Sequence, residues 1–236
     1  MSSPDTPSPE LEPSPEYLPI KKAVISVSDK EGLVDFAQGL IDEGVEIIST
    51  GGTLRELRGE GVPATPIEEY TGFPEILGGR VKTLQARIHA ELLADGRNPE
   101  HMATLHDLDF EAIDLVAVNL YPFEKKVAEG VEFEEAVENI DIGGPTLLRG
   151  GGKNWESTVA VVNPKRYSAI LEEIREHGGV ARQTRYDCFQ EVFQHTAAYD
   201  GRISEWANDQ ELPPSRLLAS EELGQDAPPS QDDAES

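Results

Sequence analysis

The sequence predicts an α/β fold in which a mostly parallel sheet is covered on both faces by helices. Two observations predict it. Short apolar runs rich in β-branched residues alternate with longer amphipathic stretches along the chain, and the apolar runs are nearly continuous. Parallel strands joined by helices are buried on both faces, so they read as continuous rather than alternating hydrophobic runs.

Four runs are predicted to be strands, at residues 23–27, 45–49, 114–119 and 158–162. The run at 114–119, Asp-Leu-Val-Ala-Val-Asn, is apolar on both faces and is therefore expected near the centre of the sheet. Ligands of such sheets bind beyond the carboxyl ends of the strands, so the loops after these runs are where chemistry is expected.

Helices are predicted between and after the strands, at 31–43, 53–60, 168–177 and 183–206. The first has apolar residues at helical spacing, namely Leu33, Phe36, Ala37, Leu40 and Ile41. The second ends at Gly61, a common helix stop. His101 and His106 are expected on a surface helix without a functional role.

The predicted domain is residues 19–208, flanked by disordered tails at 1–18 and 209–236. Residues 1–17 contain five prolines and almost no aliphatic side chains, and residues 212–236 combine prolines with acids. Segments of this composition cannot bury enough apolar surface to offset the entropy of ordering. No internal repeat of fixed period is visible.

Composition excludes several classes of protein. The 45 acidic residues outnumber the 20 basic ones, giving a net charge of −25, so the basic face that nucleic-acid binding requires is not expected. No run approaches the 20 or so apolar residues of a membrane span, and the N-terminus does not resemble a secretory signal. Cys188 is the single cysteine, so an internal disulfide is impossible. A cytoplasmic location is predicted.

The distribution of the acids favours a salt-loaded cytoplasm. Basic residues comprise only eight Lys against 12 Arg, and acids occur throughout the predicted domain, as at Asp42, Glu43, Glu56, Glu60, Glu68 and Glu69. Concentrated ions would screen the resulting repulsion. An ordinary acidic surface with a disordered acidic tail is the alternative.

Two strand-to-helix loops predict a phosphate site. The first strand leads into Ser28 and Lys30, and the second leads into residues 50–53, Thr-Gly-Gly-Thr. Helix N-termini offer free N–H groups and a positive dipole end, and glycine lets an anion approach closely. Either loop alone would be an ordinary capped turn. Two on consecutive strands indicate a phosphomonoester, because neither loop matches the P-loop or dinucleotide pattern.

Three further segments contain reactive side chains. Arg80 and Lys82 lie in a glycine-rich loop. Solvated surface charge is the alternative, but it is weakened because the chain has few cations and these two lie close together. Tyr121 follows Asn119 at the end of the central strand, where a capping Asn and core aromatics are the alternative. Asp141 precedes Gly143-Gly144, and Lys153 follows downstream. A carboxylate, free N–H groups and an amine can supply a base, an oxyanion site and an acid. No set of His, Cys and carboxylates has metal-ligand spacing.

Together these segments resemble the IMP cyclohydrolase domain of the bifunctional purine enzyme that also contains AICAR formyltransferase. The resemblance covers about residues 22–207 and rests on eight motifs in the family's order, which lie at 26–30, 49–53, 71–75, 79–84, 119–123, 139–146, 153–154 and 195–200. It implies a methylglyoxal-synthase-like fold, which is a Rossmann-like three-layer α/β/α arrangement.

The resemblance also implies a reaction and its residues. The family closes 5-formamidoimidazole-4-carboxamide ribotide (FAICAR) to IMP with loss of water, using neither a metal nor an organic cofactor. The implied catalytic residues are Lys82, Tyr121, Asp141 and Lys153, with Asp141 as general base. The implied substrate-binding residues are Ser28, Lys30, Thr50, Gly51, Gly52, Thr53, Arg80, Thr83, Asn119, Ile142, Gly143 and Gly144. The acid and base roles can be permuted among the four catalytic residues.

The sequence departs from the family pattern in two places. Gln85-Ala86 replaces a usual His-Pro beside Lys82, which is expected to alter the surroundings of the site rather than its direct contacts. Gly150-Gly151-Gly152 replaces three alanines, and glycine in a helix costs roughly 1 kcal/mol per site relative to alanine. A looser segment before Lys153 is therefore expected. The family's formyltransferase domain is expected to be missing.

Three alternatives to a cyclohydrolase stay open. The chain could be a methylglyoxal-synthase-like lyase, a non-catalytic regulatory module that binds a nucleotide, or a partner subunit of a separate AICAR formyltransferase. The purine ribotide is the predicted small-molecule partner. A homodimer and a separate formyltransferase are the protein partners left open, and neither nucleic acid nor membrane is expected.

Overall fold

The computed structural model describes residues 10–121 and 123–213. Its core is a parallel five-stranded sheet in the order β4-β3-β2-β5-β6. These strands are β2 (Lys22–Val27), β3 (Glu46–Ser49), β4 (Thr65–Pro66), β5 (Leu115–Asn119) and β6 (Val159–Val161). The predicted α/β fold with a mostly parallel sheet is confirmed, and β5 lies inside the sheet between β2 and β6, as its two-sided apolar pattern predicts.

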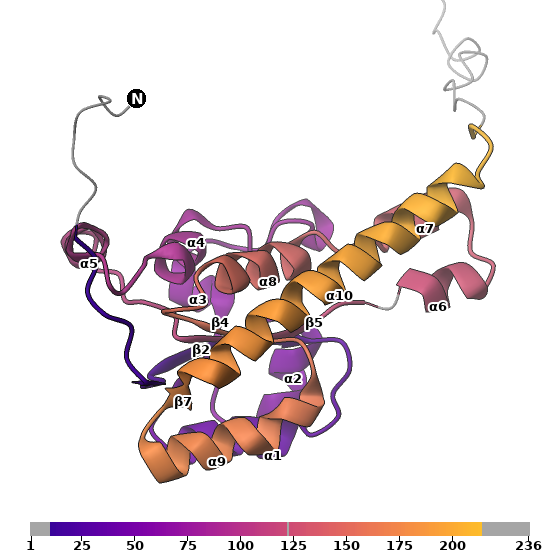
Figure 1. Ribbon diagram of the computed structural model, residues 1–236. Helices are drawn as coiled ribbons and strands as arrows, with labels where there is room; N and C mark the ends of the chain where they lie inside the picture. Colours follow the sequence, from indigo (N-terminus) through magenta and orange to yellow (C-terminus); the bar gives the residue numbers. More distant parts are fainter. Residues whose placement is uncertain (1–9, 122, 214–236) are drawn as a thin grey trace, which may run out of the picture.

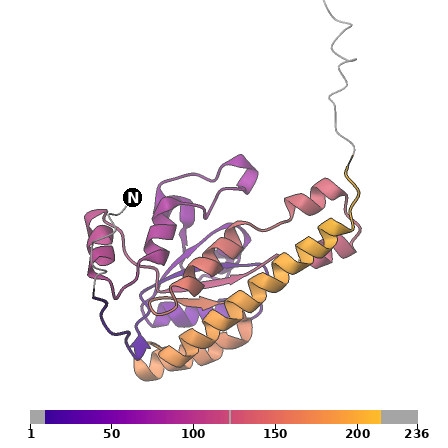
Figure 2. The same ribbon diagram turned by 45° about the horizontal axis from the view of Figure 1, so that its top comes forward.

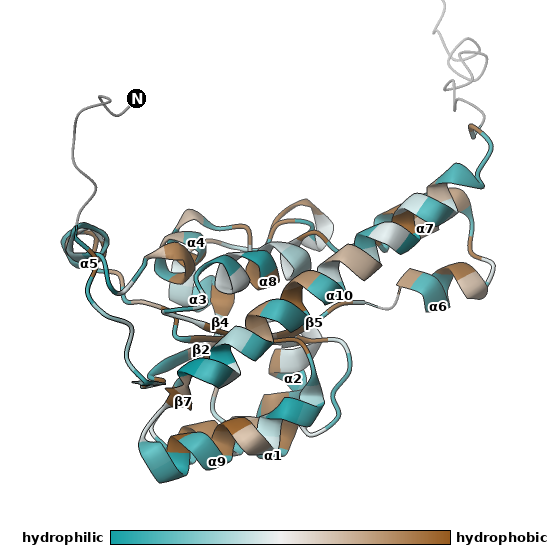
Figure 3. Ribbon diagram, viewed as in Figure 1, coloured by the Kyte–Doolittle hydropathy of each residue, from teal (hydrophilic) through white to brown (hydrophobic). Residues whose placement is uncertain are grey.

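Helices cover both faces of the sheet, which gives three layers (Figure 1). One face packs against α1 (Leu33–Asp42), α2 (Gly51–Gly59) and α9 (Tyr167–His177). The other packs against α3 (Ile67–Thr71), α4 (Ala86–Leu93), α8 (Gly143–Lys153) and the long α10 (Arg182–Asn208). Figure 3 shows the alternating hydrophilic and hydrophobic bands along α9 that are expected of a helix with one buried face.

Each strand contributes to two cores because successive side chains point to opposite faces. In β2, Ala23 and Ile25 join the core under α1 and α9, whereas Val24 joins the core under α8. In β5, Ala117 and Val116 divide in the same way. This two-sided burial explains why the sequence shows continuous rather than alternating apolar runs.

The remaining elements lie outside the central layers. They are α5 (Pro99–Asp107), α6 (Phe123–Ala128), α7 (Phe133–Glu138), the 3-10 turns η1 (Leu77–Gly79) and η2 (Pro164–Arg166), and the strands β1 (Tyr17–Leu18) and β7 (Val180–Ala181). The last two strands pair antiparallel in a small second sheet. The C-terminal half of α10 extends beyond the sheet beside α6 and α7 (Figure 2), where the ring of Trp206 contacts Phe123 and Phe133 at centroid distances of 5.3 and 5.4 Å.

The disorder predicted for residues 1–18 does not extend to residues 14–18. Arg185 is fully buried and holds this segment, because its guanidinium donates to the carbonyl of Pro15 at 2.7 Å and to Ser14 Oγ at 3.0 Å. Tyr17 and Leu18 then form β1. An arginine whose donors are taken by backbone carbonyls can be buried without a carboxylate partner. Residues 1–9 and 214–236 of the predicted tails lie outside the described residues.

The three glycines before Lys153 have a packing role that the sequence did not indicate. They lie in α8, which packs between the sheet, α4 and α10, and all three are buried. A Cβ on Gly151 would lie 2.9 Å from Val116 Cγ2 and 3.0 Å from Ala160 Cβ, both in the sheet. The glycines therefore allow α8 to approach the sheet closely, which offsets their low helix propensity.

Because of this packing, a glycine-to-alanine substitution should destabilise the protein at Gly151 in α8 but stabilise it at Gly201 in α10. Gly151→Ala should lower the free energy of unfolding by about 1–3 kcal/mol, since a methyl group must displace strand side chains. Gly201→Ala in α10 should raise it by about 0.5–1 kcal/mol, because nothing lies within 4 Å of the new methyl group. Urea unfolding of both variants measures the difference. Stabilisation by Gly151→Ala would show that α8 is not closely packed.

Candidate active site

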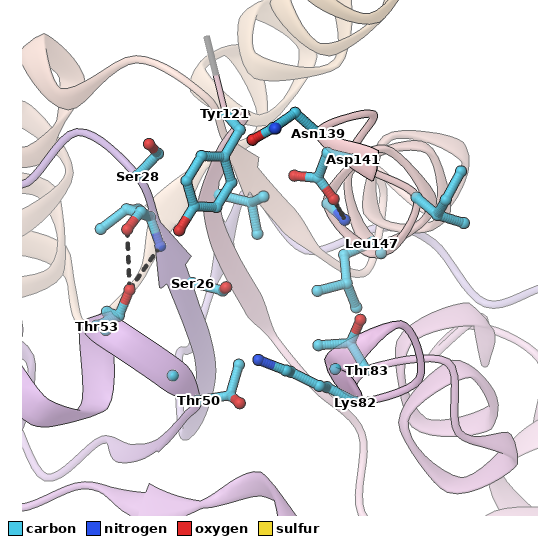
Figure 4. Close-up of a pocket in the computed structure, with 18 of the residues that line it drawn as sticks. Ser26, Ser28, Thr50, Thr53, Lys82, Thr83, Tyr121, Asn139, Asp141 and Leu147 are labelled. Carbon is cyan, nitrogen blue, oxygen red and sulfur yellow. Dashed lines mark hydrogen bonds between the residues drawn. The ribbon is translucent and has the colours of Figure 1, made fainter. Parts of the chain in front are cut away.

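The candidate site is a cavity of about 700 Å³ at the carboxyl edge of the sheet. The ends of β2 and β5, the N-termini of α2 and α8, and the loop containing Arg80 and Lys82 form its walls. This is the edge at which parallel sheets bind ligands. Segments far apart in the sequence therefore meet in one space (Figure 4).

Nearly all of the predicted site residues line this cavity. Those predicted to bind substrate are Ser28, Lys30, Thr50, Gly51, Gly52, Thr53, Arg80, Thr83, Asn119, Ile142, Gly143 and Gly144, and all of them line it. Of the residues predicted to be catalytic, Lys82, Tyr121 and Asp141 do so.

One end of the cavity concentrates positive charge at the N-terminus of α2. Lys82 Nζ lies 4.0 Å from the position of a Cβ on Gly51, and Lys30 Nζ lies 3.8 Å from the position of a Cβ on Gly52. The two ammonium groups thus flank the positive end of the helix dipole, which is an arrangement suited to a phosphate group. Thr50 Oγ1 is buried here without a hydrogen-bond partner in the described part of the chain, so a ligand oxygen can satisfy it.

Two of the residues predicted to bind substrate instead hold the loops in place. Thr53 Oγ1 accepts from Val27 N at 2.9 Å and donates to Val27 O at 3.0 Å, so its hydroxyl ties α2 to the end of β2. Asn119 Oδ1 accepts from the N–H groups of Ser28 and Asp29 at 2.6 and 2.8 Å, and its amide donates to Asp29 O. These side-chain groups are occupied by backbone, so both residues position the 28–30 loop.

The two threonines allow binding to be separated from folding. Thr53→Val should cost about 1–3 kcal/mol of unfolding free energy, because Val27 loses its buried partner. Thr50→Val should leave stability unchanged, since that hydroxyl has no partner to lose, but should weaken the binding of inorganic phosphate about tenfold. Thermal melts and calorimetric titration of both variants check this. Equal phosphate affinity in Thr50→Val and the original chain would remove Thr50 from the anion site.

The other end of the cavity contains a carboxylate in a partly desolvated position. Asp141 precedes α8, its Oδ1 accepts from Gly144 N at 2.9 Å, and its own N–H donates to the hydroxyl of Tyr199 at 2.8 Å. Burial raises the pKa of Asp141, while the backbone N–H groups of Gly144 and Tyr121 act in the opposite direction. A carboxylate with a raised pKa is a stronger base than one in water. A purely structural reading of Asp141 as a capping residue for α8 explains one oxygen but not its place in the cavity wall.

Lys82, Tyr121 and Asp141 point into the same space from three separate segments (Figure 4). Lys82 Nζ is also 3.0 Å from Glu75 Oε2, which places a carboxylate beside its ammonium group. Tyr121 is 60% exposed at the end of β5, so its hydroxyl is accessible to a ligand. An amine, a phenol and a carboxylate that face one cavity can move protons to and from a bound molecule.

Close approach explains the glycine pair at the start of α8. A Cβ on Gly143 would lie 2.5 Å from Thr83 Oγ1, and a Cβ on Gly144 would lie 2.5 Å from Asp141 Oδ2. Any larger residue would push apart the loop containing Thr83 or the Asp141 carboxylate. The pair therefore keeps these groups at the N-terminus of α8, as an oxyanion site requires.

Lys153 departs from the prediction because the structure does not bring it to the cavity. It is the exposed last residue of α8, whereas the cavity lies at the first turn of that helix. At about 1.5 Å per residue, eleven residues separate the two ends by roughly 15 Å. Lys153 is therefore not within reach of the groups that line the cavity of its own chain.

Sequence reasoning did not assign a role to several lining residues. Ser26 and Asn139 both line the cavity, as does Glu138, which pairs with Arg80. Ser26 and Asn139 lie inside the family motifs at 26–30 and 139–146, so their polar side chains were the available signal. The pairing of Glu138 with a residue 58 positions away had no sequence signal.

Gln85 and Ala86, which depart from the family pattern, are not among the residues that line the cavity. Gln85 precedes α4, where its carbonyl accepts from His89 N at 3.1 Å and lies 3.0 Å from His89 Nδ1. The altered residues thus begin the helix after Lys82 and Thr83 without entering the space that these two residues face.

Comparisons with known proteins agree with this geometry. Residues 32–146 match the family model described as MGS-like domain, and residues 151–227 match the model described as AICARFT/IMPCHase bienzyme. The chain thus combines an MGS-like domain with a segment of the AICARFT/IMPCHase bienzyme family. The resemblance and the methylglyoxal-synthase-like fold predicted from sequence are both confirmed.

Relatives in this bienzyme family are much longer than the chain. The bifunctional purine biosynthesis protein PurH of Mycobacterium ulcerans (strain Agy99) is 52% identical over 188 residues, which cover 80% of this chain and 36% of that protein. PurH of Bacillus cereus (strain AH820) is 47% identical over 209 residues, covering 87% and 41%. The chain therefore spans well under half the length of these relatives.

A solved structure supports the same fold. The crystal structure of ForH matches with a TM-score of 0.70 and 31% identity, covering 79% of this chain and 98% of that one. Within the described residues, no group of three His, Cys, Asp or Glu side chains could hold a metal ion, and no helix is long and apolar enough to cross a membrane.

Proposed function

We propose that the chain is an IMP cyclohydrolase, which closes FAICAR to IMP with loss of water in the last step of de novo purine biosynthesis. The observation that carries the proposal is the convergence of Lys82, Tyr121 and Asp141 on a cavity in which Lys30 and the N-terminus of α2 suit a phosphate. Family membership supports the same reaction. No resident metal or organic cofactor is required by it.

The cavity orients the substrate by its two ends. The 5′-phosphate lies at the N-terminus of α2, with Lys30 and the Thr50 hydroxyl as ligands, and Arg80 lies at the mouth. The formamido and carboxamide groups then extend toward Asp141. Holding two groups of one molecule face to face supplies much of the rate acceleration, because the attack becomes effectively a positioned, unimolecular step.

Ring closure requires two protons to be removed from nitrogen and one oxygen to leave as water. The carboxamide nitrogen attacks the formyl carbon while Asp141 takes its proton, which forms the C–N bond and a tetrahedral oxyanion. The N-terminal N–H groups of α8 and the Lys82 ammonium stabilise that oxyanion. Lys82 or Tyr121 then protonates the oxyanion to a hydroxyl group, and a second proton delivered to that hydroxyl lets the C–O bond break and water leave. The formamido nitrogen loses its proton as its C=N bond forms, which gives the aromatic ring of IMP, so the two protons lost by the two nitrogens equal the two that leave in water.

Lys153 keeps a catalytic role only as a prediction from the resemblance. Its distance from the cavity within one chain gives that role no geometric support. The resemblance also leads us to propose that the chain is located in the cytoplasm and that a formyltransferase supplies its substrate, FAICAR. A homodimer stays open.

The test is ultraviolet spectroscopy of the purified chain with FAICAR, which follows the appearance of IMP across a KCl series. Turnover to IMP is expected. Binding of IMP without turnover at any salt concentration would instead favour the nucleotide-binding regulatory module, for which occupation of the α2 end alone is sufficient. Release of methylglyoxal from a triose phosphate would favour the lyase.

A further inference from the structure

Arg80 holds a carboxylate at the mouth of the cavity. Its Nε donates to Glu138 Oε1 at 3.1 Å, and its NH2 group contacts the other oxygen, Oε2. Both side chains line the cavity, although Arg80 follows η1 and Glu138 is the last residue of α7. The pair raises the pKa of Arg80 and lowers the pKa of Glu138, as expected for opposite charges in contact.

The carboxylate of Glu138 occupies donors that a ligand oxyanion would use. A guanidinium presents two parallel N–H groups, and a carboxylate or a phosphate can accept from both at once. A halide ion is a single sphere and cannot replace both hydrogen bonds with the same geometry. An anion that reaches Arg80 must therefore outcompete a bidentate partner already held in place.

We propose that Glu138 is a specificity-determining residue, which competes with ligands for Arg80 and so favours bidentate oxyanions over small halide ions. This inference rests on the proposed function, since it assumes that the cavity receives a phosphorylated substrate. Selection against halides matters most for a chain whose acid excess predicts a saline environment.

The ion pair between Arg80 and Glu138 is weak enough for a ligand to displace Glu138. The side chain of Arg80 is 68% exposed and that of Glu138 is 54% exposed, so water screens their attraction. By comparison, Glu75, the partner of Lys82, is not among the residues that line the cavity. Of these two carboxylates, Glu138 is thus the one that faces an entering ligand.

The experiment measures binding of inorganic phosphate by calorimetry to the full chain. Glu138→Gln should tighten binding about two- to fivefold, the range that corresponds to an exposed ion pair. Glu135→Gln is the matched control, because it removes the same charge from α7 at a residue that does not line the cavity. In an Arg80→Ala background, Glu138→Gln should leave the phosphate affinity unchanged, because the guanidinium for which Glu138 and phosphate compete is absent.

Chloride provides the second measurement. Raising KCl should weaken phosphate binding more steeply in Glu138→Gln than in Glu135→Gln, because free Arg80 donors then become available to chloride while screening is the same in both variants. Equal phosphate affinities and equal salt slopes in these two variants would overturn the inference, as would an effect that persists without Arg80 or an absence of phosphate binding in every variant.

Turnover of FAICAR, followed on the same preparations, separates this inference from the proposed function. If the chain turns over FAICAR but Glu138→Gln does not change the phosphate affinity, only the proposed role of Glu138 is wrong. If Glu138→Gln tightens phosphate binding but no variant turns over FAICAR, only the proposed cyclohydrolase function is wrong.

Discussion

Replacing Lys82 or Asp141 by alanine should lower the rate of IMP formation by about 10²- to 10⁴-fold, the usual contribution of a positioned acid or base. Both residues lie on loops at the ends of strands and helices rather than in the apolar cores. Their truncation leaves the two cores intact, so the melting temperature should change little. Steady-state rates and circular dichroism melts of the purified variants measure the two effects.

Lys165→Ala is the matched control for the charge change, because Lys165 is exposed and does not line the cavity. It should retain the original rate. If Lys82→Ala and Asp141→Ala also turned over at near-normal rates, the assignment of the site would be wrong even if the chain formed IMP.

The same assignment implies a pH dependence. Burial raises the pKa of Asp141, and a base works only when it is deprotonated. The rate should therefore fall as the pH decreases through this raised pKa, at a higher pH than for a carboxyl group in water. Asp141→Asn should remove this acidic limb together with most of the rate.

The sequence predicted best the strands whose hydrophobic pattern follows directly from burial on both faces. The strands at 114–119 and 158–162 were expected within one or two residues of β5 and β6, because two-sided burial requires continuous apolar residues. Residues at the carboxyl ends of strands gathered at one cavity, as the topology of parallel sheets demands.

Elements whose stability comes from tertiary packing were predicted less well. Helix α8 contains Gly143, Gly144 and Pro145 in its first turn and three glycines near its end, so local propensity argues against a helix. It forms because the glycines allow close contact with the sheet, α4 and α10. In the same way, no local pattern indicated that Arg185 would hold residues 14–16, because the contacts span about 170 positions.

Sequence reasoning did not distinguish side chains that face the cavity from those that bond to the backbone or lie elsewhere. Thr50 and Thr53 occupy equivalent places in the motif, yet only Thr53 bonds to Val27. Lys153 is in the correct motif but at the opposite end of α8 from the cavity. Sequence spacing along a helix does not tell which end faces the ligand until the helix has been placed against the sheet.

The acid excess leads to a second large expected effect, a rise in melting temperature and activity from millimolar to molar KCl. The net charge is −25, and Asp42, Glu43, Glu56, Glu60 and Glu69 are exposed over the domain rather than confined to one end of the chain. At 0.01 M salt their repulsion acts over roughly 30 Å, and at 1 M over about 3 Å. Folding brings these charges together, so screening stabilises the folded state more than the unfolded chain.

Substrate binding responds to salt in the opposite direction, because its phosphate contacts weaken as ions screen them. That loss should be small beside the gain in stability, since the substrate has one phosphate and the N-terminus of α2 meets it inside a cavity. Thermal melts and rates across a KCl series test the prediction. A parallel series at fixed chloride, in which potassium glutamate supplies the remaining ions, separates screening from chloride binding in the phosphate site. A flat or falling melting temperature in both series would show that the acids form an ordinary solvated surface, and the cyclohydrolase proposal would be unaffected because none of its residues depends on that surface.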